Sequence, residues 1–179
     1  FVVLDFKQAF STLLNLGGGA INNVAGLAAS TLFRGINLIH IPTTLLGQLD
    51  STIDIKHAIN TPFGKNLVGT FYQPNVVIID PSILKSLSLK QIRSGYAEIL
   101  KHALINDKIF YQWLKKNFEN ILKLKNRVLV YAIVKSINIK AKYIVNDERE
   151  ILKNSSSRAM LNFGHTFGHA IEAINKYHS

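Results

Sequence analysis

The sequence has 179 residues, 47% of them hydrophobic, and a formal net charge of +10 at pH 7. This length allows one domain or two small ones, and this apolar content excludes a disordered chain. Cysteine is absent, so disulfides and thiolate metal sites are excluded, and any metal must be bound by His, Asp or Glu. Because no apolar run approaches the ~20 residues that span a bilayer and no signal peptide is recognisable, we expect no membrane partner and a cytoplasmic protein.

The positive charge has three interpretations. Clustered Lys and Arg could bind nucleic acid, scattered Lys could lie on solvated helix faces, or cations could bind an anionic small substrate. The lysines are scattered through segments such as residues 124–142 and form no basic block. We therefore expect no nucleic-acid partner.

The first half of the chain predicts strands and loops. The short apolar run 12–16 precedes a glycine triplet, and residues 24–33 favour a helix. The β-branched runs 36–42 and 76–80, bounded by Gly, Pro and Asn, are typical of buried strands. Between them lies the polar, glycine-bearing stretch 47–70, which we interpret as a long functional loop.

The second half predicts helices. Ser88 is the expected N-cap of a helix over about 89–106, and Asp107 is the expected N-cap of the next helix. The further elements expected, in order, are a helix near 127–146, a polar loop at 151–158 and a last helix over about 159–176. The change in composition predicts a boundary near residue 88, with an α/β part over 1–88 and a helical part over 89–179.

Two segments of the first half could bind phosphate groups. Glycines at 17–19 between a strand and a helix would let the backbone approach a phosphate, although a tight turn without a ligand explains them equally well. The stretch 47–70 contains Asp50, Lys56, Lys65 and Asn66, and lysines suit phosphate as point charges. A solvated loop remains the alternative for these residues.

Two groups in the second half could take part in metal chemistry. Glu98, Lys101 and His102 share one face of the predicted helix, where a surface ion pair is the alternative. His165 and His169 are four residues apart, an arrangement that suits zinc, although a buried histidine pair is also open. Two histidines cannot complete a zinc site, and Glu98 is the natural third candidate.

Five ordered segments carry a resemblance to a known family. They are IPTTLLGQLDS, GKNLVGTFYQP, RSGYAEILKHALI, NDERE and MLNFGHTFGHAIE. Together they resemble the blocks of the 3-dehydroquinate synthase family, and the resemblance extends from about residue 15 to 174. It implies a Rossmann-like α/β domain followed by an α-helical domain, both incomplete here, with the site between them. It also implies a third zinc-ligating histidine beyond residue 179, so we expect these 179 residues alone to be inactive.

The resemblance implies functions for individual residues. The implied NAD contacts are Gly17, Gly18, Gly19, Ala20, Ile21, Asn22, Asn23, Thr43, Thr44, Lys56, Lys65, Ile83, Leu84, Lys85 and Ser86. The implied ligands of zinc, or cobalt, are Glu98 and His165. The implied substrate and catalytic positions are Asp50, Lys56, Asn66, Lys101, Lys140, Arg158, Asn162 and His169.

The implied activity is that of an NAD- and metal-dependent lyase of the shikimate pathway, which leads to chorismate and the aromatic amino acids. Such an enzyme converts 3-deoxy-D-arabino-heptulosonate 7-phosphate to 3-dehydroquinate and phosphate. The alternatives are a relative that forms an inosose or a valiolone, a glycerol-dehydrogenase-like enzyme and a catalytically inactive remnant. The sequence leaves a homodimer open.

Two segments depart from the family pattern. Asn22 and Asn23 stand where the family has Gly and Asp, and we expect Asn22 to preserve the turn by adopting the left-handed conformation. Asp54 and Ile55 replace two glycines, where positive φ would be costly and the carboxylate would repel phosphate. We therefore expect this loop to bend differently or to bind NAD less well. About four extra residues before Arg158 predict a surface insertion.

Overall fold

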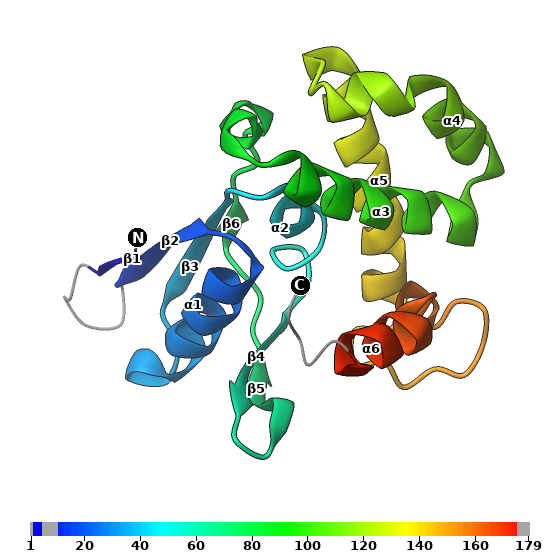
Figure 1. The fold of residues 1–179 in the computed structure, drawn as a ribbon. Coiled ribbons are helices and arrows are strands. Elements are labelled where there is room, and N and C mark those ends of the chain that lie inside the picture. The colour runs from blue at the N-terminus through cyan, green and yellow to red at the C-terminus, as the bar shows by residue number, and fades with distance from the viewer. Residues whose placement is uncertain (1, 5–10, 175–179) are drawn as a thin grey trace.

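The computed structural model describes residues 2–4 and 11–174. Its larger sheet has the order β1-β2-β3-β6 (Figure 1). The strands are β1 (Val2–Leu4), β2 (Thr12–Gly17), β3 (Asn37–Pro42) and β6 (Val76–Val77). β1 runs antiparallel to β2, whereas β2, β3 and β6 are parallel to one another. The predicted strands at 12–16 and 36–42 are confirmed, and the strand predicted over 76–80 is shorter than expected.

Helix α1 (Gly19–Thr31) follows β2 after the single residue Gly18 and packs on the sheet. Its buried side chains Ala25 and Ala29 pack in a small core with Leu13 of β2, with Leu38 of β3 and with Ile36, which precedes β3. The helix begins five residues before the predicted start at Val24 because Gly19–Asn23 adopt helical conformation. The glycine triplet therefore ends at the first turn of this helix.

The interpretation of 47–70 as a long loop is wrong. The stretch contains the end of the short helix α2 (Leu45–Leu49) and an antiparallel hairpin of β4 (Lys56–Thr61) and β5 (Gly64–Phe71). Only the turn after α2 and the reversal at Pro62–Phe63 lie outside regular structure. Most side chains of β5 are exposed, and polar residues and glycines in the hairpin hide the alternation that identifies a strand.

Three long helices follow, as predicted: α3 (Leu89–Asn106), α4 (Lys108–Leu122) and α5 (Asn126–Asn146). Ser88 forms a capping box with Gln91 at the start of α3. The Asp107 carboxylate accepts the Phe110 backbone N–H at 2.8 Å, which caps α4. Both predicted N-caps are confirmed.

The last predicted helix is interrupted. The 3-10 helix Arg158–Asn162 is separated from α6 (His165–Ile174) by a turn at Phe163 and Gly164, and Gly164 has φ +83°. Glycine adopts this left-handed angle without the steric cost that a side chain would impose. The expected end of the helix near residue 176 lies outside the described residues.

The helical core includes residues from the first half of the chain. Leu45 and Leu49 of α2, together with Leu84 of the 3-10 helix Pro81–Ser86, are fully buried among side chains of α3, α4 and α5. Gly95 permits this contact, because a Cβ there would lie 2.5 Å from Leu45 Cγ. No helix within the described ranges is long and apolar enough to cross a membrane.

Candidate functional site

The glycine turn opens α1 with an uncapped N-terminus. Gly18 is the N-cap residue and no side chain hydrogen-bonds to the first backbone N–H groups of the helix. Parallel pairing sets Gly17 beside Pro42, and the Thr43 N–H donates to the Gly17 carbonyl at 2.9 Å. Free N–H groups at a helix N-terminus favour an anion. The turn and the Thr43–Thr44 segment therefore form one edge that fits a phosphate-bearing cofactor.

A Cβ at Gly18 would approach Thr44 Cγ2 to 3.1 Å, so the turn and α2 are closely fitted. Thr44 itself caps α2, since its hydroxyl accepts the Gly47 N–H at 3.0 Å. The predicted segment Ile83–Ser86 lies in the 3-10 helix that packs against α5. Because the Leu84 side chain belongs to the core, only its backbone could contact a ligand.

Asn22 does not adopt the left-handed conformation that we expected to preserve the glycine turn. Asn22 is helical and fully buried, and its φ is not positive. Its Oδ1 accepts from Asn15 Nδ2 at 2.6 Å, and its Nδ2 donates to Ser51 Oγ at 2.8 Å. The Asn22 side chain therefore links β2 to the turn after α2, and both its oxygen and its nitrogen are hydrogen-bonded within the protein.

The same network contains a buried histidine, His40 of β3. Asn15 Nδ2 lies 2.7 Å from His40 Nδ1, so Nδ1 acts as the acceptor and the ring is neutral. The ring of His57 in β4 lies 5.7 Å away, centroid to centroid. Burial, and then the charge of His57, lower the pKa of His40 to about 4.

This depressed pKa predicts a loss of stability in mild acid. An unfolded His titrates near 6.5, so between pH 6.5 and 4 the unfolded chain binds more protons than the folded one. Stability is full above pH 6.5 and falls as the pH decreases, by about 2 kcal/mol between pH 7 and 5. Urea unfolding at both pH values should show this decrease, and His40→Gln should reduce it. An equal decrease in the variant would assign the effect to other groups.

The predicted triad on α3 is confirmed as one contact group. Lys101 Nζ and His102 Nε2 lie 2.7 Å and 3.0 Å from Glu98 Oε1. Neither contact has regular hydrogen-bond geometry, so Glu98 Oε1 and His102 Nε2 are buried without a hydrogen bond. Ser136 of α5 orients the imidazole, since its Oγ lies 2.6 Å from His102 Nδ1.

The environment of Glu98 suits a metal ligand. Burial acts to raise its pKa, but the contacts with His102 and Lys101 outweigh burial and lower the pKa to about 2. An ionised carboxylate oxygen that lacks a hydrogen bond can accept a cation. Within the described parts of the chain, no three His, Asp or Glu side chains gather as a complete metal site. His165 is exposed at the start of α6, and the His169 side chain lies outside what the structure describes.

A second charged group joins the turn after α2 to the helical part. Lys140 of α5 pairs with the Asp50 carboxylate, and its Nζ also donates to the Asp50 carbonyl at 3.1 Å. Arg158 pairs with Asp54, whose other oxygen lies 3.9 Å from Lys140 Nζ. Burial acts to raise the Asp54 pKa, but Lys140, the Lys56 backbone N–H and Arg158 lower it overall. Ile55 is buried and its φ is not positive, so the turn avoids the costly conformation that glycine would permit.

Glu150 contacts two more of the predicted substrate residues, Lys56 and Asn162. Its Oε2 pairs with Lys56 Nζ, and its Oε1 accepts from Asn162 Nδ2 at 2.8 Å. Lys56 thus contacts a protein carboxylate from a loop 94 residues away. Sequence reasoning did not single out Glu150, although it lies in the NDERE block.

Asp147 holds the loop that brings Arg158 into place. Its carboxylate accepts backbone N–H groups from Ile151 at 2.7 Å and from Arg158 at 3.1 Å. It also accepts the Ser157 hydroxyl at 3.2 Å. The intervening residues 151–156 are exposed, as the predicted insertion requires.

A cavity of about 510 Å³ lies between the hairpin and the turn after α2. Residues of both predicted sets line it, namely Asn23, Asp50, Lys56 and Asn66, and Asp54 lines it beside them. Asn66 lies in β5 with φ +55°, and its backbone N–H donates to Asn60 Oδ1 at 3.2 Å. Lys65, its neighbour, is exposed. The structure therefore brings part of the predicted cofactor and substrate sets to one cavity.

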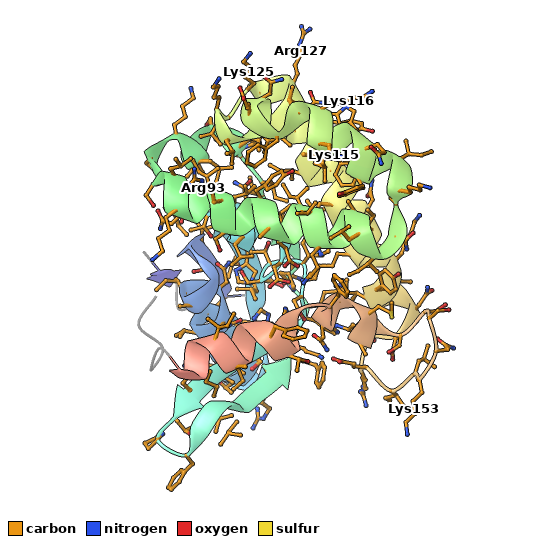
Figure 2. The ribbon with its side chains drawn as sticks, turned by 45° about the vertical axis from the view of Figure 1, so that its right-hand side comes forward. Arg93, Lys115, Lys116, Lys125, Arg127 and Lys153 are labelled. Atoms are coloured by element: carbon orange, nitrogen blue, oxygen red, sulfur yellow. The ribbon has the colours of Figure 1, made fainter. Side chains whose placement is uncertain are left out.

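Most lysines and arginines of the described residues lie away from this cavity. Figure 2 shows labelled cations of the helical part and of the loop at its end projecting outward, and all of them are exposed: Arg93, Lys115, Lys116, Lys125, Arg127 and Lys153. Among the described residues, Lys140 and Arg158 alone of the lysines and arginines are buried. The positive charge is thus largely on solvated helix faces, whereas the buried cations face carboxylates beside the cavity.

Family models cover the two parts of the chain. The 3-dehydroquinate synthase N-terminal model matches residues 5–94, and the 3-dehydroquinate synthase C-terminal model matches residues 95–179. The chain belongs to the 3-dehydroquinate synthase family. The junction of the two models falls within α3. The resemblance drawn from the five sequence segments is thereby confirmed.

Individual members of the 3-dehydroquinate synthase family are similar over nearly the whole chain. The enzyme of Aliivibrio fischeri is 48% identical over 93% of this chain and 45% of its own length. That of Pelagibacter ubique is 48% identical over 96% of this chain and 46% of its own length. The chain therefore spans less than half the length of these relatives.

Solved structures share the fold. The 2-epi-5-epi-valiolone synthase of Streptomyces hygroscopicus, with NAD+ and Zn2+ bound, matches 89% of this chain and 44% of its own with a TM-score of 0.80 at 28% identity. A 2-deoxy-scyllo-inosose synthase matches 92% of this chain and 44% of its own with a TM-score of 0.62 at 34% identity. The expected α/β, Rossmann-like part followed by a helical part is confirmed.

Proposed function

We propose that this chain is part of a 3-dehydroquinate synthase, which converts 3-deoxy-D-arabino-heptulosonate 7-phosphate to 3-dehydroquinate and phosphate. The 48% identity to enzymes of that name over more than nine-tenths of the chain carries the proposal. The valiolone and inosose synthases are less similar, at 28% and 34% identity. The described geometry supports it through an uncapped helix N-terminus, a largely buried carboxylate at Glu98 and two buried cations whose carboxylate partners, Asp50 and Asp54, line one cavity.

The cofactors we propose are NAD and a zinc or cobalt ion. Structures of related cyclases contain NAD+ with Zn2+ or Co2+. In this chain the turn from Gly17 to Asn23 would hold the NAD phosphates, and Glu98 with His165 would contribute metal ligands. When bound, NAD supplies a reversible hydride acceptor and the metal supplies Lewis acidity.

The chain's own residues would bind and orient an anionic sugar phosphate. A relative was solved with carbaglucose-6-phosphate, NAD+ and Co2+. We assign binding of the phosphate and carboxylate to cations beside the cavity, with Lys140 and Arg158 at their centre. Asp50 and His169 are the proton-handling or orienting candidates. Lys101 stays beside Glu98, where its charge keeps the carboxylate ionised.

Turnover of the full-length protein tests the proposal. With NAD and zinc present, we expect release of inorganic phosphate from 3-deoxy-D-arabino-heptulosonate 7-phosphate and formation of 3-dehydroquinate. Heptulose 7-phosphate and glucose 6-phosphate serve as comparison substrates. Release from a comparison substrate alone would assign the protein to another cyclase, and release from none would identify an inactive member.

A further inference from the structure

Asp54 stands between the cavity and two buried cations. Arg158 and Lys140 have side-chain exposures of 3% and 2%. One Asp54 oxygen pairs with Arg158, and the other lies 3.9 Å from Lys140 Nζ, which also pairs with Asp50. Asp54 lines the cavity whereas Arg158 does not. A carboxylate that spans a guanidinium and an ammonium reproduces the contacts that a bound phosphate or carboxylate group would make.

The position of this carboxylate is fixed by its backbone. Asp54 Oδ1 also accepts the Lys56 backbone N–H at 2.9 Å, and the Asp54 N–H donates to the Asp50 carbonyl at 2.9 Å. These two hydrogen bonds therefore hold the Asp54 carboxylate in one position beside the cations. The carboxylate is charged at neutral pH, and its lowered pKa extends that charge into acid. A residue without this side chain, such as glycine, would open Arg158 toward the cavity.

We propose that Asp54 is an internal competitor for the anion subsite formed by Arg158 and Lys140, and that it sets the affinity of this subsite for phosphate and carboxylate groups. An incoming anion must displace a tethered carboxylate and also tolerate its charge nearby. Tethering gives the internal group a high effective concentration, so the competition does not depend on other solutes. This inference rests on the proposed function in taking the cavity as the substrate site.

The pair of Glu150 and Lys56 can be compared with the pair of Asp54 and Arg158. Glu150 pairs with Lys56, which lines the same cavity, but the side chains of Glu150 and Lys56 are 27% and 37% exposed. Exposed pairs exchange readily with solvent and contribute little. Asp54 is 25% exposed, like Glu150, but its partner Arg158 is only 3% exposed, so the Arg158–Asp54 pair is the contact whose removal should change anion affinity most.

The test uses calorimetric titration of the full-length protein with inorganic phosphate. Asp54→Asn and Asp54→Gly should bind phosphate about tenfold more tightly than the parent. Adding Arg158→Gln to Asp54→Asn should abolish this gain. Glu119→Gln removes one negative charge from an exposed pair with Lys123 and serves as the charge-matched control, with no expected gain.

Asp54→Asn, the isosteric change, carries the test if the glycine variant does not fold. Parental phosphate affinity in Asp54→Asn, or a gain that survives Arg158→Gln, would overturn the proposal. The titration needs neither NAD nor turnover, so it remains informative if the proposed enzyme activity is not found. Absence of turnover with tightened phosphate binding would contradict the proposed function and leave the subsite in place.

Discussion

Replacement of Gly26 by alanine should destabilise the fold by about 3 kcal/mol, the upper end of ordinary overpacking. Gly26 lies in α1 against β4, and a Cβ there would be 2.2 Å from His57 Cγ. The His57 ring is fully buried and its Nε2 lies 3.0 Å from the Tyr72 carbonyl, so it cannot move away without losing that contact. Either α1 or the hairpin must shift.

Urea unfolding of the full-length protein measures this effect. Gly168→Ala is the matched control, because Gly168 lies in α6 with nothing within 4 Å of an added Cβ. Alanine favours helix over glycine by up to about 1 kcal/mol, so the control should be neutral or stabilising. Equal stability of Gly26→Ala and the parent would show that α1 and β4 are less closely packed than described.

Glu98→Gln should reduce zinc affinity at least about a hundredfold, if Glu98 is the metal ligand that we propose. An amide keeps the shape but lacks the charge, and zinc sites use ionised carboxylates. Loss of even an outer-sphere partner of a ligand costs about 10–100-fold in metal affinity, so loss of a ligand should cost more. Zinc content after dialysis and competition with a chelating dye report the change.

Two controls isolate the metal effect. Glu119→Gln makes the same substitution at an exposed pair with Lys123 and should retain zinc. The melting temperature in EDTA shows whether Glu98→Gln damages the fold, since it leaves Lys101 and the buried His102 without their carboxylate. Unchanged zinc content in Glu98→Gln would falsify the ligand assignment.

The sequence predicted elements wherever local signals were sufficient. Ser88 and Asp107 predict the starts of α3 and α4 because an N-cap side chain contacts the backbone only three residues away. The parallel strands β2 and β3 were predicted because buried strands read as apolar runs. The hairpin of β4 and β5 was missed because its polar side chains and glycines resemble those of a loop.

The side-chain network could not be predicted because its partners are far apart in the chain. Arg158 and Asp54 are separated by 104 residues, and Lys140 and Asp50 by 90. Local sequence showed Asp54 only as a charge in place of glycine, which suggested repulsion of a ligand. Its actual partners are cations, and only the packing of α5 and the loop after it against α2 reveals them.

The double anchorage by Asp147 has a practical consequence for how the loop over 151–156 can vary. Asp147 binds the loop where it leaves α5 and again where it returns at Ser157 and Arg158. A longer or shorter loop would therefore not shift the residues that these contacts fix. The loop can thus change length without displacing the guanidinium of Arg158. A fluorophore or affinity tag placed near Asn154 should report on the protein from outside while leaving the buried charges in register.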